Sequence, residues 1–293
     1  ENLGYHASAK LEDFQNNPGS SGYLKAPLSI DGELKVVTDE IQNFQLNIHS
    51  PQSKDSLVLL AQAKNISTAP QVQIKLESDS MDFDKLFNLP PLKQASAHGF
   101  QWIPEATAEE AVVSDYDQLI SGYMAYPILK KTTASFVAKI KLLKLYDIAL
   151  SSIFLESLFQ DLILKVPALG LQVFGGTVEA QAGMDLNSKH PTWWMDRFEV
   201  KNLDMKRAMT SQLKLFKNTV YGNADIVFKG KGQSLNPEPA KKSLDLTGKA
   251  RIQNAEFTSI DVGSMATEAI NKNIDKFGEK IPGLKGKSLE KLP

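Results

Sequence analysis

The feature that most constrains the fold of this chain is an alternation of apolar and polar residues with a period of two. From Leu244 to Ile252, Leu, Gly, Ala and Ile fall on one side, while Asp, Thr, Lys and Arg fall on the other. Because successive side chains of a strand point to opposite faces, such runs predict half-buried strands. We therefore expect a mainly β fold with a mostly antiparallel sheet that has one apolar face. The other clear runs are residues 72–77, 136–142, 177–186 and 224–229.

Other strand signals are less regular. Near Leu142 and Leu143 the apolar phase slips by one residue, which is typical of a β-bulge and predicts a curved sheet. Between Leu145 and Phe174 the apolar residues are too dense for periodicity to separate helix from strand, and we interpret this segment as strand. Residues 1–25, with Asn, Pro, Gly and Ser filling positions 16–22, predict loop.

Helical spacing occurs in a few places. Residues 106–124 fit a short amphipathic helix, and residues 264–281 fit a longer one that ends at Pro282 and Gly283. The apolar positions of the first are Ala111, Val112, Leu119, Ile120 and Tyr123, and those of the second are Ala266, Ile270, Ile274, Phe277 and Ile281.

A short element recurs three times, in which an Asp between apolar residues follows a strand and precedes a helix. The three carboxylates are Asp82, Asp204 and Asp261. An Asp at a helix start accepts hydrogen bonds from unpaired backbone N–H groups and favours the positive end of the helix dipole. We therefore interpret the repeat as structural and not as a set of catalytic acids.

Few residues suggest enzymatic chemistry. The chain has no cysteine, its 33 basic and 34 acidic residues balance, and its four histidines have no partner at metal-ligand spacing. The nucleophile elbow of hydrolases and the phosphate loop are missing, and no basic aromatic stripe suggests nucleic-acid binding. Glycosidase chemistry stays open, because its two carboxylates can be distant in sequence. We predict no catalytic residue, no metal and no cofactor.

Four stretches of the second half resemble the C-terminal region of the AsmA family of bacterial envelope proteins. They are a Gly-Gly strand opening, a strand that ends in apolar-Asp-apolar before a short helix, a strand with a Lys-Gly-Lys-Gly turn, and a Leu-Thr-Gly-Lys-Ala strand that leads to Asp261. The similarity is strongest from about residue 135 to 262 and is looser over 32–90. The four stretches are 175–180, 194–209, 221–232 and 246–261.

The resemblance implies more than the alternation does. AsmA-like proteins are related to bridge-type lipid transporters, in which a folded-over β-sheet forms a long apolar groove for phospholipid tails. The family also has an N-terminal inner-membrane anchor, which this chain lacks. We therefore expect a piece of a periplasmic protein of a Gram-negative bacterium that is anchored in the inner membrane, with outer-membrane components as further partners.

These observations together predict the fold and the function. We expect an elongated, curved β-groove unit over residues 26–262, preceded by a polar segment at 1–25 and followed by an amphipathic helix and basic tail at 263–293. Its predicted function is non-enzymatic: it binds phospholipid or another acyl-chain lipid and contributes to phospholipid transport and outer-membrane homeostasis. The candidate lipid contacts are the apolar residues Leu162, Leu164, Val166, Val178, Ala180, Ala182, Met184, Leu244, Leu246, Ala250 and Ile252.

Two other interpretations remain open. The apolar face can be a closed core, in which case the chain is a scaffold that recruits envelope proteins through sheet edges and assists outer-membrane protein assembly. The third interpretation is an enzyme that acts on carbohydrate or peptidoglycan. Bound phospholipid favours lipid transport over both.

Overall fold

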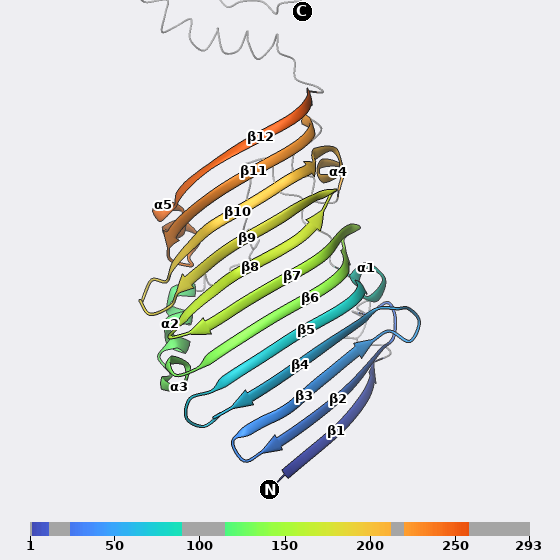
Figure 1. The fold of residues 1–293 in the computed structure, drawn as a ribbon, viewed down its shortest axis with the longest axis vertical. Coiled ribbons are helices and arrows are strands. Elements are labelled where there is room, and N and C mark those ends of the chain that lie inside the picture. Colours follow the sequence, from blue (N-terminus) through green and yellow to red (C-terminus); the bar gives the residue numbers. More distant parts are fainter. Residues whose placement is uncertain (1, 12–23, 90–114, 212–219, 258–293) are drawn as a thin grey trace, which may run out of the picture.

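The computed structural model of the chain describes residues 2–11, 24–89, 115–211 and 220–257. These residues form one sheet of twelve strands that lie side by side in the order of the sequence (Figure 1). The strands are β1 (Asn2–Leu11), β2 (Leu28–Val37), β3 (Glu40–His49), β4 (Ser56–Lys64), β5 (Gln71–Asp82), β6 (Thr133–Leu145), β7 (Ile148–Gln160), β8 (Ile163–Val173), β9 (Gly176–Asp185), β10 (Thr192–Asp204), β11 (Val220–Gln233) and β12 (Asp245–Phe257).

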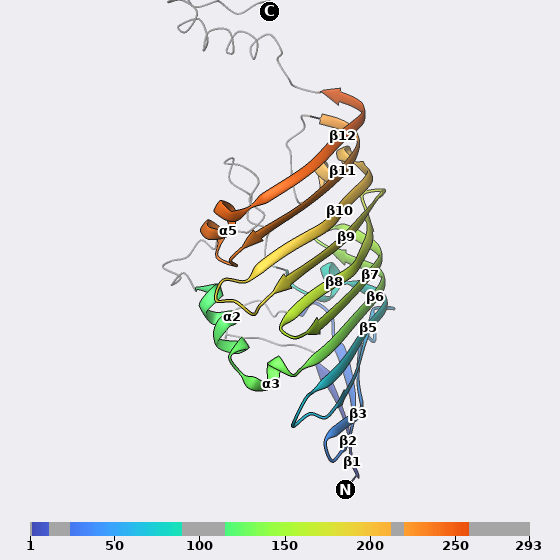
Figure 2. The same cartoon turned by 60° about the vertical axis from the view of Figure 1, so that its left-hand side comes forward.

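Five short helices accompany the sheet and lie at the ends of its strands. They are α1 (Phe83–Leu86), α2 (Tyr116–Met124), α3 (Pro127–Lys130), α4 (Met205–Thr210) and α5 (Pro237–Ser243). Helices α1 and α4 lie at one margin of the sheet, and α2, α3 and α5 lie at the other (Figure 1). Turning the sheet shows that it is twisted and bowed (Figure 2). The predicted C-terminal helix at 264–281 and the third repeat copy at Asp261 lie outside the described residues.

Neighbouring strands are antiparallel with one exception. β5 and β6 pair in parallel, with Leu76 opposite Ala138. Parallel neighbours need a crossover connection, because the chain must return to the same end of the sheet before the second strand begins. The segment from α1 to α3 makes this return. The mainly β, mostly antiparallel fold predicted from the alternation is confirmed, although the parallel pair was not predicted.

The strand register separates the residues into two faces, because directly paired residues lie on the same side of a sheet. One unbroken line of pairs crosses eleven strands and contains only Gly, Ala, Leu and Phe; we call it the apolar row and its side the apolar face. The apolar row is Gly32, Leu46, Leu59, Leu76, Ala138, Leu155, Leu169, Ala180, Phe198, Phe228 and Gly248.

The opposite side, the polar face, has a different composition. The adjacent line of pairs carries six charged residues among its eleven positions. It consists of Asp31, Asn47, Val58, Glu77, Lys139, Phe154, Gly170, Glu179, Glu199, Val227 and Lys249. The prediction of a sheet with one apolar face is therefore confirmed.

Few side chains are deeply buried. Leu28, Met81 and Leu86 form a core cluster where α1 meets the sheet, whereas most apolar strand residues are half-buried. Each strand packs against its sheet neighbours, and helices α1, α4 and α5 pack only near strand ends. Among the described elements, no second layer packs over the apolar face.

Two local predictions have opposite outcomes. The register of β7 against β8 shifts between Ser151 and Phe154, so that Leu150, opposite Val173, lies on the apolar face. Leu143 pairs with Leu150 and Leu142 pairs with Ser151, so the predicted change of phase between Leu142 and Leu143 is present. The predicted loop over residues 1–25 is wrong for its first part. Asn2–Leu11 forms β1 and pairs along its whole length with β2.

Candidate functional site

Six of the predicted lipid contacts lie together on the apolar face, in the neighbouring strands β8 and β9. Leu164 is opposite Met184, and Val166 is opposite Ala182. Beyond Val166 the register shifts, because Pro167 and Ala168 together stand opposite Gln181. This bulge keeps the later residues of β8 in phase with Ala180 and Val178. The antiparallel pairing thus gathers these six side chains into one patch.

Three further predicted contacts lie on the same face at the end of the sheet. Leu246, Ala250 and Ile252 of β12 stand opposite Gly230, Ile226 and Ala224 of β11. Their side chains are exposed, and Leu246 reaches 52% exposure, because among the described strands β12 has a neighbour on one side only. The apolar face therefore continues to the edge of the described sheet.

The other two predicted contacts lie outside the strands. Leu162 sits in the turn between β7 and β8 with a left-handed φ of 57°, and its side chain is only 3% exposed. Leu244 follows helix α5 as its C-cap. The alternation of the strands does not extend to Leu162 or Leu244, because each lies just before its strand, β8 or β12, begins.

The structure adds residues to this face that the sequence did not single out. The rings of Phe198 and Phe228 stack with centroids 4.5 Å apart, between Ala180 on one side and Gly248 on the other. The small residues at these two positions leave room for the rings. The alternation of Phe198 and Val200 was visible in the sequence, but their position between β9 and β11 depends on strand order. Met195 and Leu155 also lie on this face.

The tryptophan pair packs on glycines of neighbouring strands. Trp194 lies over Gly183 of β9 on the polar face, and Trp193 lies over Gly232 of β11 on the apolar face. A Cβ atom on either glycine would overlap the indole ring. The two indole rings therefore serve as packing residues of the sheet.

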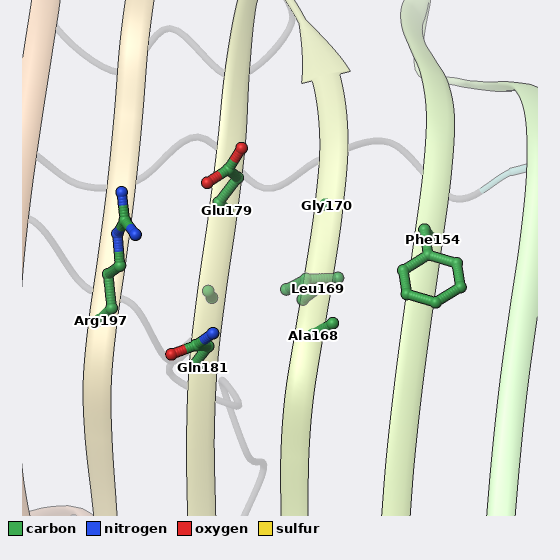
Figure 3. Close-up of a pocket in the computed structure, with 8 residues that line it drawn as sticks. Phe154, Ala168, Leu169, Gly170, Glu179, Gln181 and Arg197 are labelled. Carbon is green, nitrogen blue, oxygen red and sulfur yellow. The ribbon is translucent and has the colours of Figure 1, made fainter.

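A shallow depression of about 240 Å³ lies on the polar face between β7, β8, β9 and β10 (Figure 3). Phe154, Glu179 and Arg197 lie in front of the strands, whereas Leu169 lies behind them. The depression exists because Gly170 has no side chain to fill it. Arg197 is already paired with Glu199, and the volume is smaller than that of typical ligand sites. We therefore place the candidate site on the apolar face.

The carboxylates with shifted pKa values have structural partners. The Asp225 carboxylate accepts hydrogen bonds from the backbone N–H of Asn202 and from the side-chain amide of Gln253, and both lower its pKa. These bonds link β10, β11 and β12. A hydrogen bond from Lys201, assisted by Arg197, lowers the pKa of Glu199. Such shifts can mark active sites, but here the Asp225 carboxylate connects neighbouring strands, and the Glu199 carboxylate pairs with cations of its own strand.

Burial alone would raise the pKa of Asp117, but three hydrogen bonds outweigh it and lower that pKa. The donors are the Leu235 backbone N–H at 2.6 Å, the Ser234 hydroxyl at 2.7 Å and Nδ1 of His190 at 2.8 Å. This cluster contains Ser, His and Asp, yet the Ser hydroxyl bonds to the carboxylate and not to the imidazole. A nucleophile–base pair is therefore not formed.

Two copies of the predicted repeat are confirmed as helix caps. Asp82 accepts a hydrogen bond from the Lys85 backbone N–H at 3.1 Å, and Asp204 accepts one from that of Arg207 at 3.0 Å. Within the described ranges, no three metal-ligating side chains come together as a possible metal site. The absence of catalysis stays a prediction.

No helix in the described part of the chain combines the length and apolar character that a membrane span needs. No protein-family model, curated protein or solved structure matches the chain. The similarity to the AsmA family therefore stays a prediction from the quoted stretches.

Proposed function

We propose that the chain is a non-enzymatic lipid-binding unit that shelters acyl chains on the apolar face. The observation that supports this most is the apolar row, which crosses eleven strands without a polar side chain and without a described element packed over it. At roughly 4.8 Å between strands, the row extends about 48 Å across the sheet. Soluble monomers seldom expose contiguous apolar areas of more than a few hundred Å² unless the area binds something.

The physical basis of binding is desolvation. Moving a CH₂ group from water to an apolar surface gains about 0.8 kcal/mol, so an acyl chain gains several kcal/mol even when one side of it stays uncovered. Contacts with Leu, Val, Phe and Ala side chains have no directional preference. A lipid tail can therefore slide from strand to strand, which suits transport better than a fixed site does.

The bowing of the sheet is part of the proposal. We propose that the curved sheet forms an apolar groove, with the patch of Leu164, Val166, Ala182 and Met184 as one segment of its lining. The proposed setting is the periplasm of a Gram-negative bacterium, where the full-length protein is anchored in the inner membrane and moves phospholipid towards the outer membrane.

Lipid extraction from protein purified from cells, followed by native mass spectrometry, tests the proposal. We expect phospholipid to co-purify at about one molecule or more per chain. Protein without lipid that also fails to take up a fluorescent fatty acid would contradict the proposal. Hydrolysis of cell-wall material would instead support the enzymatic interpretation.

Matched substitutions test which face binds. Ala182→Asp and Ala250→Asp place a charge on the apolar face, and each should lower lipid uptake about tenfold, because a charge in contact with acyl chains is costly. The matched controls are Gln181→Asp and Thr247→Asp, which lie on the polar face of the same strands. If both sets of variants lowered lipid uptake equally, binding on the apolar face would be contradicted.

One observation favours a second candidate function. Residues 245–256 of β12 are exposed throughout, so this strand offers a long edge to another β-strand. We propose as the alternative an interaction scaffold that assists outer-membrane protein assembly. Pull-down of outer-membrane proteins that is lost with proline at Lys249, while lipid is absent, would favour it.

A further inference from the structure

Helix α2 turns three of its large apolar side chains away from the protein. Tyr116, Leu119 and Tyr123 share one side of the helix and are 47%, 50% and 55% exposed. The opposite side carries Asp117, which is only 1% exposed. The sequence predicted an amphipathic helix over residues 106–124, and the part of it that the structure describes, Tyr116–Met124, is helical. Of its predicted apolar positions, Ile120 is half-buried, whereas Leu119 and Tyr123 are exposed.

Polar contacts hold the helix in this orientation. Asp117 accepts hydrogen bonds from residues of two loops, the β9–β10 loop and the loop after β11. Asn236 adds two more: its amide oxygen accepts the Tyr116 backbone N–H at 2.9 Å, and its amide nitrogen donates to Asp115 at 2.9 Å. The inner side is therefore specified by a buried carboxylate, and exposure of the aromatic side is built into the fold.

The apolar surface continues beyond the helix. Tyr126 is 60% exposed and Ile128 is also exposed, and the exposed Lys130 and Lys131 follow. The segment 116–131 contains three of the seven tyrosines of the chain. Its charged residues are Asp117, Lys130 and Lys131, and because Asp117 is buried, its exposed charge is positive.

We propose that residues 116–131, which we call the tyrosine margin, dock on the surface of a bilayer that contains anionic phospholipid. Tyrosine suits the headgroup region because its ring is apolar and its hydroxyl is polar. The lysines add attraction to anionic headgroups, each contributing about 1 kcal/mol near such a surface. Exposed apolar side chains next to lysines favour a membrane over a protein partner, and the exposed Asp115 that precedes the segment caps the helix and is hydrogen-bonded to Asn236.

This inference rests on the proposed lipid-binding function and adds a loading point to it. Helix α3 leads directly into β6, so docking of the tyrosine margin places the adjoining strand ends near a bilayer. Helices α2 and α3 stand beside the sheet along this margin (Figure 2). A lipid that leaves the bilayer there reaches the middle of the sheet and not its edge.

Vesicle flotation tests the docking. Vesicles of phosphatidylethanolamine and phosphatidylglycerol at 3:1 should bind the protein, and vesicles of phosphatidylcholine should bind it several-fold more weakly. The triple variant Tyr116→Ser, Leu119→Ser, Tyr123→Ser should bind about tenfold more weakly than the original chain, since three apolar contacts are lost. The matched control is Ile66→Ser, Leu158→Ser, Val227→Ser, which removes three exposed apolar side chains elsewhere and should bind normally.

Charge-reversal variants test the contribution of the lysines. Lys130→Glu with Lys131→Glu should abolish the preference for anionic vesicles, whereas the same change at the exposed Lys241 and Lys242 should leave it. Equal binding of the tyrosine variant and its control would overturn the inference. Sedimentation velocity that shows a dimer dissociated by the tyrosine variant would also overturn it, in favour of a second copy of the chain as the partner.

A monomeric lipid separates this inference from the proposed function. A fluorescent fatty acid below its micelle concentration needs no bilayer, so the tyrosine variant should take it up normally. If the original chain takes up the fatty acid but binds no vesicles, the docking inference fails and the lipid-binding function stands. If it takes up no fatty acid, the lipid-binding function fails as well.

Discussion

Asp117 of α2 and Ser234 of the loop after β11 are hydrogen-bonded at 2.7 Å, although 117 residues separate them in the sequence. The same carboxylate receives the Leu235 backbone N–H, so its replacement leaves buried donors without an acceptor. We expect Asp117→Asn to lower the free energy of unfolding by about 2 kcal/mol. Urea unfolding measures this. Asp115→Asn is the control and should change stability by less than about 0.5 kcal/mol, because Asn caps a helix as well as Asp does.

The Asp117 cluster also predicts a pH dependence. Its hydrogen bonds hold the pKa of Asp117 below the ordinary value, so its contribution to stability is present above about pH 4 and is lost as pH falls through the lower folded-state pKa. Urea midpoints at pH 7 down to pH 2.5 should therefore fall more for the original chain than for Asp117→Asn. Parallel curves for the two proteins would show that Asp117 does not titrate as we expect.

Two glycines in adjacent strands should respond differently to the same substitution. A Cβ on Gly183 overlaps Trp194, whereas a Cβ on Gly170 meets nothing within 4 Å. Gly183→Ala should therefore destabilise the protein by about 1–3 kcal/mol through displacement of the indole. Gly170→Ala should be neutral or slightly stabilising, because it restricts the unfolded chain. Thermal unfolding with tryptophan fluorescence compares the two, and equal losses would contradict this packing.

The capping aspartates offer a graded test. Asp204→Ala removes the acceptor for the Arg207 backbone N–H and should cost about 1 kcal/mol. Asp82→Ala should cost more, because both aspartates lie near a cation three residues on, but Asp82 is buried and Asp204 is partly exposed. The conservative change Asp204→Asn should keep most of the stability. Chemical denaturation orders the three variants, and a larger loss at Asp204 than at Asp82 would contradict the assignment.

The sequence predicted those parts of the fold that depend on local periodicity. The alternation at 177–186 became β9, and that at 244–252 became most of β12. We did not predict β1 because turn-forming residues, among them Asn and Gly, follow it at 16–22, and because the small residues Ala7 and Ala9 occupy two of its alternate positions. The parallel pairing of β5 with β6 was not predictable from pattern, because it depends on where a long connection returns.

The candidate site, too, was predictable only where it depends on local periodicity. Val178 and Ala182 share a face by periodicity alone, but the bulge at Pro167 and Ala168 decides which residues of β8 join them. The exposure of Leu119 and Tyr123 on α2 could not be predicted, since the contacts of Asp117 with His190, Ser234 and Leu235, which are distant in the sequence, orient the helix. Local pattern gives the faces of a strand, whereas the outward side of a short helix depends on its tertiary partners.

Photo-crosslinking along β9 tests the central claim most directly. A benzophenone amino acid placed in turn at positions 177 to 184 reports which side chains contact lipid, and the register assigns alternate positions to opposite faces. We predict crosslinks to phospholipid from positions 178, 180, 182 and 184, and none from 177, 179, 181 and 183. Equal crosslinking from both sets, or crosslinking from the polar set alone, would contradict the account.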